Sequence, residues 1–139
     1  MKAYVDTSVL LRIVLGEPHP LREWRRIDFA LSSELTRVEA LRTIDRARIR
    51  LGLTDAEVAR QRGDVLATLD AFHIARLDQA VLERAAEPFP TMLRTLDALH
   101  LATALLARLD HADLVLATHD ETLAMGGRAL GFRIVGADG

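Results

Sequence analysis

The chain alternates between short apolar runs and longer stretches in which apolar residues recur every three or four positions. Short apolar runs bounded by polar or turn residues predict buried strands, and the three-to-four spacing predicts amphipathic helices. We therefore predict five strands, within residues 2–5, 28–33, 72–77, 112–118 and 132–135. We predict helices over residues 7–15, 20–26, 35–51, 55–69, 78–86, 95–109 and 120–130.

Turn and capping residues mark several of these boundaries. The sequence Gly16-Glu17-Pro18 ends the first helix, and Gly52 ends the helix over 35–51. Thr54 and Glu57 have the spacing of a capping box and begin the helix over 55–69. The helices over 35–51 and 55–69 are consecutive, so we expect a helical hairpin inserted between strands.

The regular alternation of strand and helix predicts an α/β fold, with a mainly parallel sheet of four to five strands and helices on both faces. The 139 residues fit a single domain, residues 1–139, with one hydrophobic core. Ligands of such sheets bind beyond the carboxyl ends of the strands, so polar residues at those positions are the first candidates for a functional site.

Composition narrows the class of protein. Half of the residues are hydrophobic and 27% are charged, which is ordinary for a soluble globular domain. No apolar run reaches the roughly 18–20 residues that span a membrane, and the N-terminus lacks the pattern of a signal peptide. We therefore expect a cytoplasmic protein without membrane association. The chain has no cysteine, which excludes disulfides and thiolate metal sites.

The basic residues are almost all arginine, with Lys2 as the single lysine, while the net charge is −2. A G+C-rich genome can produce this bias without any functional cause. The lack of a late lysine argues against receiver-type phosphoacceptor domains and against haloacid-dehalogenase-like phosphatases, whose DxDxT signature is also missing. No GxxxxGK[ST] sequence is present, which excludes a P-loop.

Two aspartates stand where a predicted strand passes into a helix. Asp6 follows the strand over 2–5, and Asp120 follows the strand over 112–118. Each aspartate can be a functional residue at the carboxyl end of its strand, where ligands bind. Each can equally be a helix cap stabilised by the helix dipole, with Thr7 or Ser8 as competing caps for the first helix.

Two further acids lie on predicted helices. Asp97 is in the first turn of a strongly apolar helix, where the helix dipole favours it, but a carboxylate amid so much apolar surface needs a partner or a metal ion. His100 lies on the same face and reads as a hydrogen-bonded core histidine or as a metal ligand. Glu39 borders the apolar stripe of its helix, and it can also be a solvated acid paired with Arg42 or Thr43.

Taken together, these four acids predict a divalent cation site. Several carboxylates at one place repel one another unless they share protons or hold cations. A site that has only oxygen ligands favours Mg²⁺ or Mn²⁺ over zinc. Carboxylate-held divalent ions are a common arrangement for phosphodiester hydrolysis, because they activate the attacking water and stabilise the leaving oxygen.

Four segments carry a resemblance to a known family: YVDTSVLL, SSELTRVEALR, TLDALHLATAL and LATHDETLAMGGRALGFRIV. In this order they resemble a PIN domain, and more closely the VapC-type ribonuclease toxins of VapBC toxin–antitoxin modules. Residues 52–90 carry no such motif. The resemblance implies a three-layer α/β/α fold, Mg²⁺- or Mn²⁺-dependent endoribonuclease activity on RNA, homodimerisation and inhibition by a VapB-type antitoxin.

The resemblance also implies roles for particular residues. It makes Asp6, Glu39, Asp97 and Asp120 the catalytic, metal-holding acids, with Asp6 and Asp97 as the firmest ligands. It makes Ser8 and Thr118 the hydroxyls that orient carboxylates, and it gives His119 no role.

Two sets of residues are candidates for contact with partners. Arginines near the predicted site can contact RNA or antitoxin, although each also reads as part of a solvated basic face: Arg12, Arg42, Arg46 and Arg50. Apolar residues near the N-terminus can form a groove for an antitoxin helix or can be core: Leu10, Leu11, Ile13, Val14 and Trp24.

Two other functions use the same fold or chemistry. A catalytically inactive PIN-like module that binds RNA or protein is the main alternative, although the presence of all four acids favours an active nuclease. A flap-type nuclease acting on DNA shares the metal chemistry but normally needs a longer chain.

Overall fold

The structure is a computed structural model that describes residues 1–137, so the last two positions of the predicted 1–139 domain lie outside the described residues. The elements follow in the order β1 (Lys2–Val5), α1 (Thr7–Val14), η1 (Trp24–Arg26), β2 (Phe29–Ser33), α2 (Glu34–Leu51), α3 (Asp55–Asp70), β3 (His73–Ala75), α4 (Gln79–Ala86), α5 (Thr95–Arg108), β4 (Val115–Ala117), α6 (Glu121–Ala129) and β5 (Ile134–Val135).

The five strands form one sheet in the order β3-β2-β1-β4-β5, and every neighbouring pair is parallel. The longest-range pairing joins β1 to β4, with Tyr4 opposite Leu116 and Val5 opposite Ala117. The predicted α/β fold with a parallel sheet is therefore confirmed. Because all strands run the same way, their carboxyl ends share one edge of the sheet, and the order changes direction at β1.

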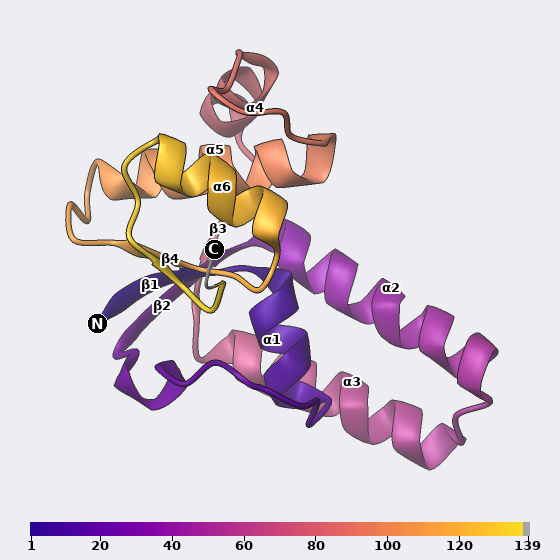
Figure 1. The fold of residues 1–139 in the computed structure, drawn as a ribbon. Helices are drawn as coiled ribbons and strands as arrows, with labels where there is room; N and C mark the ends of the chain where they lie inside the picture. Colours follow the sequence, from indigo (N-terminus) through magenta and orange to yellow (C-terminus); the bar gives the residue numbers. More distant parts are fainter. Residues whose placement is uncertain (138–139) are drawn as a thin grey trace.

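Helices cover both faces of the sheet, as predicted. Helices α5 and α6 lie on one face, α1 and α3 lie on the other, and the hairpin of α2 and α3 projects to one side of the molecule (Figure 1). Alternate residues of β1 supply the two cores: Tyr4 packs under Leu101 and Leu123, whereas Ala3 and Val5 pack with Val9 on the opposite face. A third cluster, which includes Leu10 and Ile44, fills the space between α1 and the α2–α3 hairpin.

The caps of the hairpin helices agree with the sequence signals. Ser33 caps α2 by accepting a hydrogen bond from the backbone N–H of Leu35, and Gly52 ends that helix in a left-handed conformation. Thr54 and Glu57 make the predicted capping box at the start of α3. The hairpin is therefore closed by local signals, whereas its position depends on the third apolar cluster.

The predicted helix over 20–26 was wrong. Only a three-residue 3₁₀ turn, η1, forms there. Two prolines flank His19, whose φ of 58° lies in the left-handed region, and the chain then turns so that Leu21 becomes buried. Pro20 has no amide proton and fixes its own φ, so it favours a rigid loop over an early helix. The strands β3, β4 and β5 are also shorter than the apolar runs that predicted them.

The apolar residues considered for an antitoxin groove belong mainly to the core. Leu10 is fully buried, and Leu11 and Val14 pack against the same cluster. Trp24 packs against the apolar cluster that contains Val5 and Val9, and its ring centroid lies 6.1 Å from that of Phe72. No helix among residues 1–137 is both long and apolar enough to cross a membrane.

Candidate active site

Asp6 lies at the carboxyl end of β1, directly before α1, and two hydroxyls hold its carboxylate. Ser8 donates to Asp6 Oδ2 over 2.7 Å, and Thr118, at the end of β4, donates to the same oxygen over 2.8 Å. The Asp6 side chain makes no capping hydrogen bond to α1. The capping interpretation therefore fails for its side chain, and the two hydroxyls occupy one oxygen, which leaves Oδ1 for other contacts.

A buried chain of polar groups fixes Glu39 from behind. His100 Nε2 hydrogen-bonds Glu39 Oε1, and Thr7 Oγ1 donates to the same oxygen over 2.8 Å. The other ring nitrogen of His100, Nδ1, lies 2.6 Å from the hydroxyl of Tyr4, which is fully buried in β1. His100 is therefore a hydrogen-bonded core histidine that holds Glu39 in place.

The His100–Glu39 pair shifts both groups toward their charged forms. Burial opposes the charge on Glu39, but the hydrogen bond and charge of His100 outweigh it, so the pKa of Glu39 falls below its usual value. Burial likewise opposes protonation of His100, yet the hydrogen bond to Glu39 and the charge of Asp6 raise its pKa above the usual value. His100 Nε2 also lies 3.7 Å from Asp6 Oδ1. One imidazole therefore faces two carboxylates.

Asp97 and Asp120 lie at the starts of helices α5 and α6, which pack on the other face of the sheet from α1 (Figure 1). Asp97 is in the first turn of α5, and Asp120 caps α6 by accepting a hydrogen bond from the backbone N–H of Leu123 over 3.0 Å. The capping interpretation of Asp120 therefore holds, and it does not prevent a second role for this carboxylate. Burial raises the pKa of Asp97, and the nearby charges of Asp120 and Asp6 raise it further. The acids therefore repel one another across a shared space.

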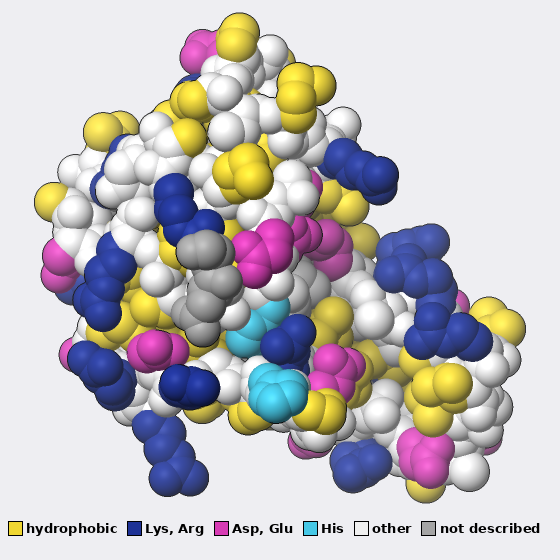
Figure 2. Space-filling model, viewed as in Figure 1, with side chains coloured by type: hydrophobic (Ala, Val, Ile, Leu, Met, Phe, Trp, Pro, Cys, Tyr) yellow, Lys and Arg dark blue, Asp and Glu magenta, His cyan; other side chains and the backbone are white. Residues whose placement is uncertain are grey.

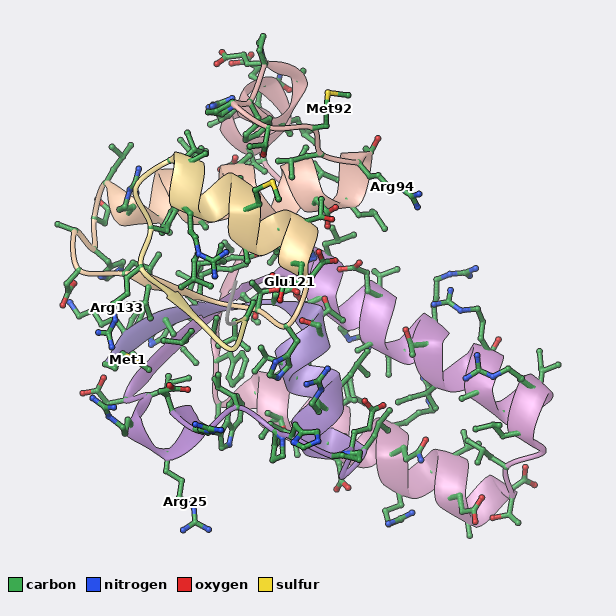
Figure 3. The ribbon with its side chains drawn as sticks, viewed as in Figure 1. Met1, Arg25, Met92, Arg94, Glu121 and Arg133 are labelled. Atoms are coloured by element: carbon green, nitrogen blue, oxygen red, sulfur yellow. The ribbon has the colours of Figure 1, made fainter. Side chains whose placement is uncertain are left out.

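These side chains surround one pocket of about 440 Å³. Figure 2 shows acidic side chains gathered in the hollow beside the projecting hairpin, with basic side chains along the hairpin. Glu121 lies at the start of α6 (Figure 3). The pocket brings together all four predicted acids, Ser8 and two of the four predicted arginines; its lining residues with charged or hydroxyl groups are Asp6, Thr7, Ser8, Glu39, Arg42, Thr43, Arg46, Asp97, His100 and Asp120.

The remaining predicted arginines lie elsewhere. Arg12 lines a separate pocket and donates to the backbone oxygen of His19, and Arg50 is exposed near the end of α2. Glu39 makes no side-chain pair with Arg42 or Thr43 among the described residues; Thr43 instead donates to the Glu39 backbone oxygen. A larger apolar pocket of about 650 Å³ lies between α4 and the start of α5, and it contains none of the four acids.

The donor set suits a hard divalent cation. Carboxylate and hydroxyl oxygens surround the pocket, and their mutual repulsion is what a bound cation relieves. Within residues 1–137, no three acidic or histidine side chains converge on one point closely enough to make a finished metal site. Mg²⁺ commonly uses one or two carboxylates and keeps several waters. The arrangement therefore fits such an ion.

Sequence reasoning missed two contributors to this site. Thr7 was considered only as a cap, yet its hydroxyl binds Glu39. Tyr4 was predicted only as part of a buried strand, yet its hydroxyl holds the far side of His100. A tyrosine in a fully buried strand needs a polar partner, and that requirement was the signal that could have linked it to His100.

Comparison with known proteins identifies the family. The family model described as PIN domain matches residues 3–125. The curated protein ribonuclease VapC46 of Mycobacterium tuberculosis is 34% identical over 136 residues, which cover 95% of each chain. Ribonuclease VapC47 of the same species is 35% identical over 136 residues, covering 93% of this chain and 92% of that protein.

Solved structures share the fold at low sequence identity. VapBC2 from Rickettsia felis, bound to a DNA fragment from its promoter, superposes with a TM-score of 0.68 at 10% identity, over 97% of this chain and 99% of that chain. A toxin–antitoxin complex from Klebsiella pneumoniae gives a TM-score of 0.60 at 23% identity, over 88% and 91% of the two chains. The chain belongs to the PIN-domain family and, by its curated relatives, to the VapC-type members of that family.

Proposed function

We propose that this protein is a Mg²⁺- or Mn²⁺-dependent endoribonuclease that acts as the toxin of a toxin–antitoxin pair. The observation that carries the proposal is the single pocket onto which Asp6, Glu39, Asp97 and Asp120 open. The ribonuclease names of relatives that match along nearly the whole chain support the substrate class. The solved toxin–antitoxin structures share this fold, and a VapB-type partner is proposed on that likeness. A homodimeric toxin is proposed from the family resemblance of the sequence.

In this proposal the four acids hold the cation, with Asp6 and Asp97 as its main protein ligands. When bound, the metal ion would supply an activated water and stabilise the leaving oxygen of the phosphodiester. Ser8 and Thr118 keep Asp6 Oδ2 engaged, so Oδ1 is the oxygen free to face the pocket. Thr7 and His100 both bind Glu39 Oε1, which leaves Oε2 as the oxygen available for a water or a cation.

The pKa shifts of Glu39 and Asp97 have opposite directions. The pKa of Glu39 is lowered, so Glu39 stays ionised near neutral pH. The pKa of Asp97 is raised by burial and by the charges of Asp120 and Asp6, so Asp97 gains most from a neutralising cation. Arg42 and Arg46 line the same pocket and are placed to hold RNA phosphates at its rim.

Total cellular RNA is the substrate for the test, because no target sequence need be guessed. Purified protein is incubated with this RNA, with and without Mn²⁺, and new 5′ ends are mapped. Asp97→Asn is the control, since it keeps the shape of the side chain and removes its charge. We expect discrete metal-dependent ends that the variant does not produce. No new ends from folded, antitoxin-free protein would favour the alternative, an inactive PIN-like module that binds RNA or protein.

A further inference from the structure

A second pocket lies on the other side of α1 from the acids. It has a volume of about 320 Å³, and its walls come from Arg12 of α1, residues 19–23 of the following loop, His119 shortly after β4 and Gly136 directly after β5. Its lining residues are Arg12, His19, Pro20, Leu21, Arg22, Glu23, His119 and Gly136. Two guanidinium groups and a single carboxylate line this pocket, so its formal charge is positive and suits an anion.

The walls of this pocket are fixed by contacts between segments that are distant in sequence. Arg12 donates one N–H to the backbone oxygen of His19, and a guanidinium has four further N–H donors. The His119 ring bonds the backbone oxygen of Gly136 through Nδ1 over 2.9 Å. His19 is held at a φ of 58°, a conformation that persists in a non-glycine residue only where its surroundings enforce it. The backbone of the pocket is therefore fixed by the fold, while Arg22 adds an exposed side chain at its edge.

One hydroxyl links this pocket to the acids. Ser8 donates to Asp6 and accepts from the backbone N–H of His119 over 3.0 Å, and Arg12 is one helical turn after Ser8 on α1. Figure 2 shows histidine and basic side chains next to the acidic group on the same face of the molecule. The acids and the basic pocket are therefore joined through Ser8, and a chain bound at the acids has a basic site beside it.

We propose that this pocket binds a backbone phosphate of the RNA strand, next to the phosphodiester that is cut, through Arg12 and Arg22. The proposal rests on the proposed function, and it adds a second phosphate contact to the one proposed for Arg42 and Arg46. Carboxylates repel phosphates that are not bridged by metal ions, so a nuclease of net charge −2 needs a local basic site beside them. Arg22 is exposed and free to adjust to the phosphate, whereas Arg12 is half-buried and preset by His19.

The test compares two arginines of the same segment. Arg22 lines the pocket, whereas Arg25, on η1, is exposed and extends away from the molecule (Figure 3). Arg22→Ser and Arg25→Ser are each made in the Asp97→Asn background, so that binding is measured without cleavage. The probe is a fluorescein-labelled single-stranded RNA of mixed sequence, titrated by fluorescence anisotropy in Mg²⁺ at several salt concentrations.

We expect Arg22→Ser to weaken RNA binding about tenfold, the loss of one charge-assisted contact, and to reduce the salt slope by about 0.7. Arg25→Ser is expected to change affinity less than twofold. A second probe set carries one neutral methylphosphonate linkage at successive positions. One position should weaken binding to the parent protein and have no effect on Arg22→Ser. Equal losses for both arginines, or no position dependence, would overturn the pocket proposal.

These outcomes are separable from the outcome for the nuclease itself. Metal-dependent RNA ends together with equal losses for Arg22→Ser and Arg25→Ser would leave the nuclease standing and remove the phosphate pocket. A position-specific loss for the parent protein that Arg22→Ser abolishes, without any cleavage by the wild-type protein, would support the phosphate pocket and remove the nuclease.

Discussion

Replacing Tyr4 and His100 singly and together tests the buried polar chain behind Glu39. Tyr4→Phe removes a hydroxyl that is fully buried and leaves His100 Nδ1, 2.6 Å away, without that partner. His100→Leu removes the same hydrogen bond from the other side and also releases Glu39 Oε1. The two substitutions therefore share one interaction, and their effects on the free energy of unfolding should not add.

The structure sets the size of each effect. Leaving one buried polar group unpaired costs about 1–3 kcal/mol, so we expect about 1–2 kcal/mol for Tyr4→Phe. We expect about 2–4 kcal/mol for His100→Leu, which breaks two bonds. Glu39 keeps its bond to Thr7 when His100 is replaced. The double variant should lose about 1–2 kcal/mol less than the sum of the single losses.

Urea unfolding followed by tryptophan fluorescence measures these values, because Trp24 is the single tryptophan and packs beside Phe72. The matched control combines Tyr4→Phe with Ile44→Val, which lies in a different apolar cluster and should add without coupling. If Tyr4→Phe and His100→Leu were additive to within about 0.5 kcal/mol, the shared hydrogen bond would contribute nothing and the reasoning would be refuted.

The same pair predicts a pH dependence. The folded pKa of His100 is raised, so its contribution is complete below its unfolded value of about 6.5 and is lost as pH rises through the folded pKa. The folded pKa of Glu39 is lowered, so its contribution is present above its unfolded value of about 4.3 and is lost as pH falls through the folded pKa. The stability advantage of wild type over His100→Leu should therefore be largest between about pH 4.3 and 6.5 and should shrink on both sides.

The other predictions concern single positions. Asp120→Ala should cost about 1 kcal/mol in urea unfolding because it removes the α6 cap. Asp120→Asn should keep the cap and lose RNA cleavage. Equal losses of stability in the two variants would contradict this. Asp97→Asn in EDTA should raise the melting temperature at pH 7 but not at pH 3, because a carboxyl whose folded pKa is raised destabilises the fold only when it is ionised. A lower melting temperature of the variant at pH 7 would refute the repulsion of Asp97 by the neighbouring acids. Gly136→Ala should cost about 2–4 kcal/mol, since φ is +98° and a Cβ would lie 2.6 Å from the Thr118 backbone oxygen. Gly63→Ala, a helical control with open space around it, should gain about 0.5–1 kcal/mol, and a loss there would contradict the assumed helix propensity.

Local signals in the sequence predicted the elements well where they were strong. The capping box of Thr54 and Glu57 fixed the start of α3, and Gly52 fixed the end of α2. The failure over 20–26 came from reading polar spacing as helical where Pro20 and the burial of Leu21 favour a loop. Local patterns therefore predicted the ends of helices correctly, and they failed where tertiary packing overrides a short helix-like pattern.

The site was partly predictable for a different reason. Asp6 and Asp120 follow strands, so the shared carboxyl edge of a parallel sheet was enough to bring them together. For the chain of Tyr4, His100 and Glu39, the sequence signalled only that a buried Tyr4 needs a polar partner. Which partner it meets depends on three elements whose relative rotation only the packed core fixes. The Arg12 pocket was missed likewise, since it needs loop 16–23 to fold against the residues after β4 and β5.

The pairing of β1 with β4 has a consequence for the timing of synthesis. The Thr118–Asp6 hydrogen bond joins residues 112 positions apart, and Asp120 follows two residues later. A growing chain therefore has no assembled pocket until β4 has left the ribosome and docked beside β1, however early the α2–α3 hairpin forms. If the pocket is the nuclease site, products of interrupted translation are inert, and harm to the cell begins only with nearly finished molecules.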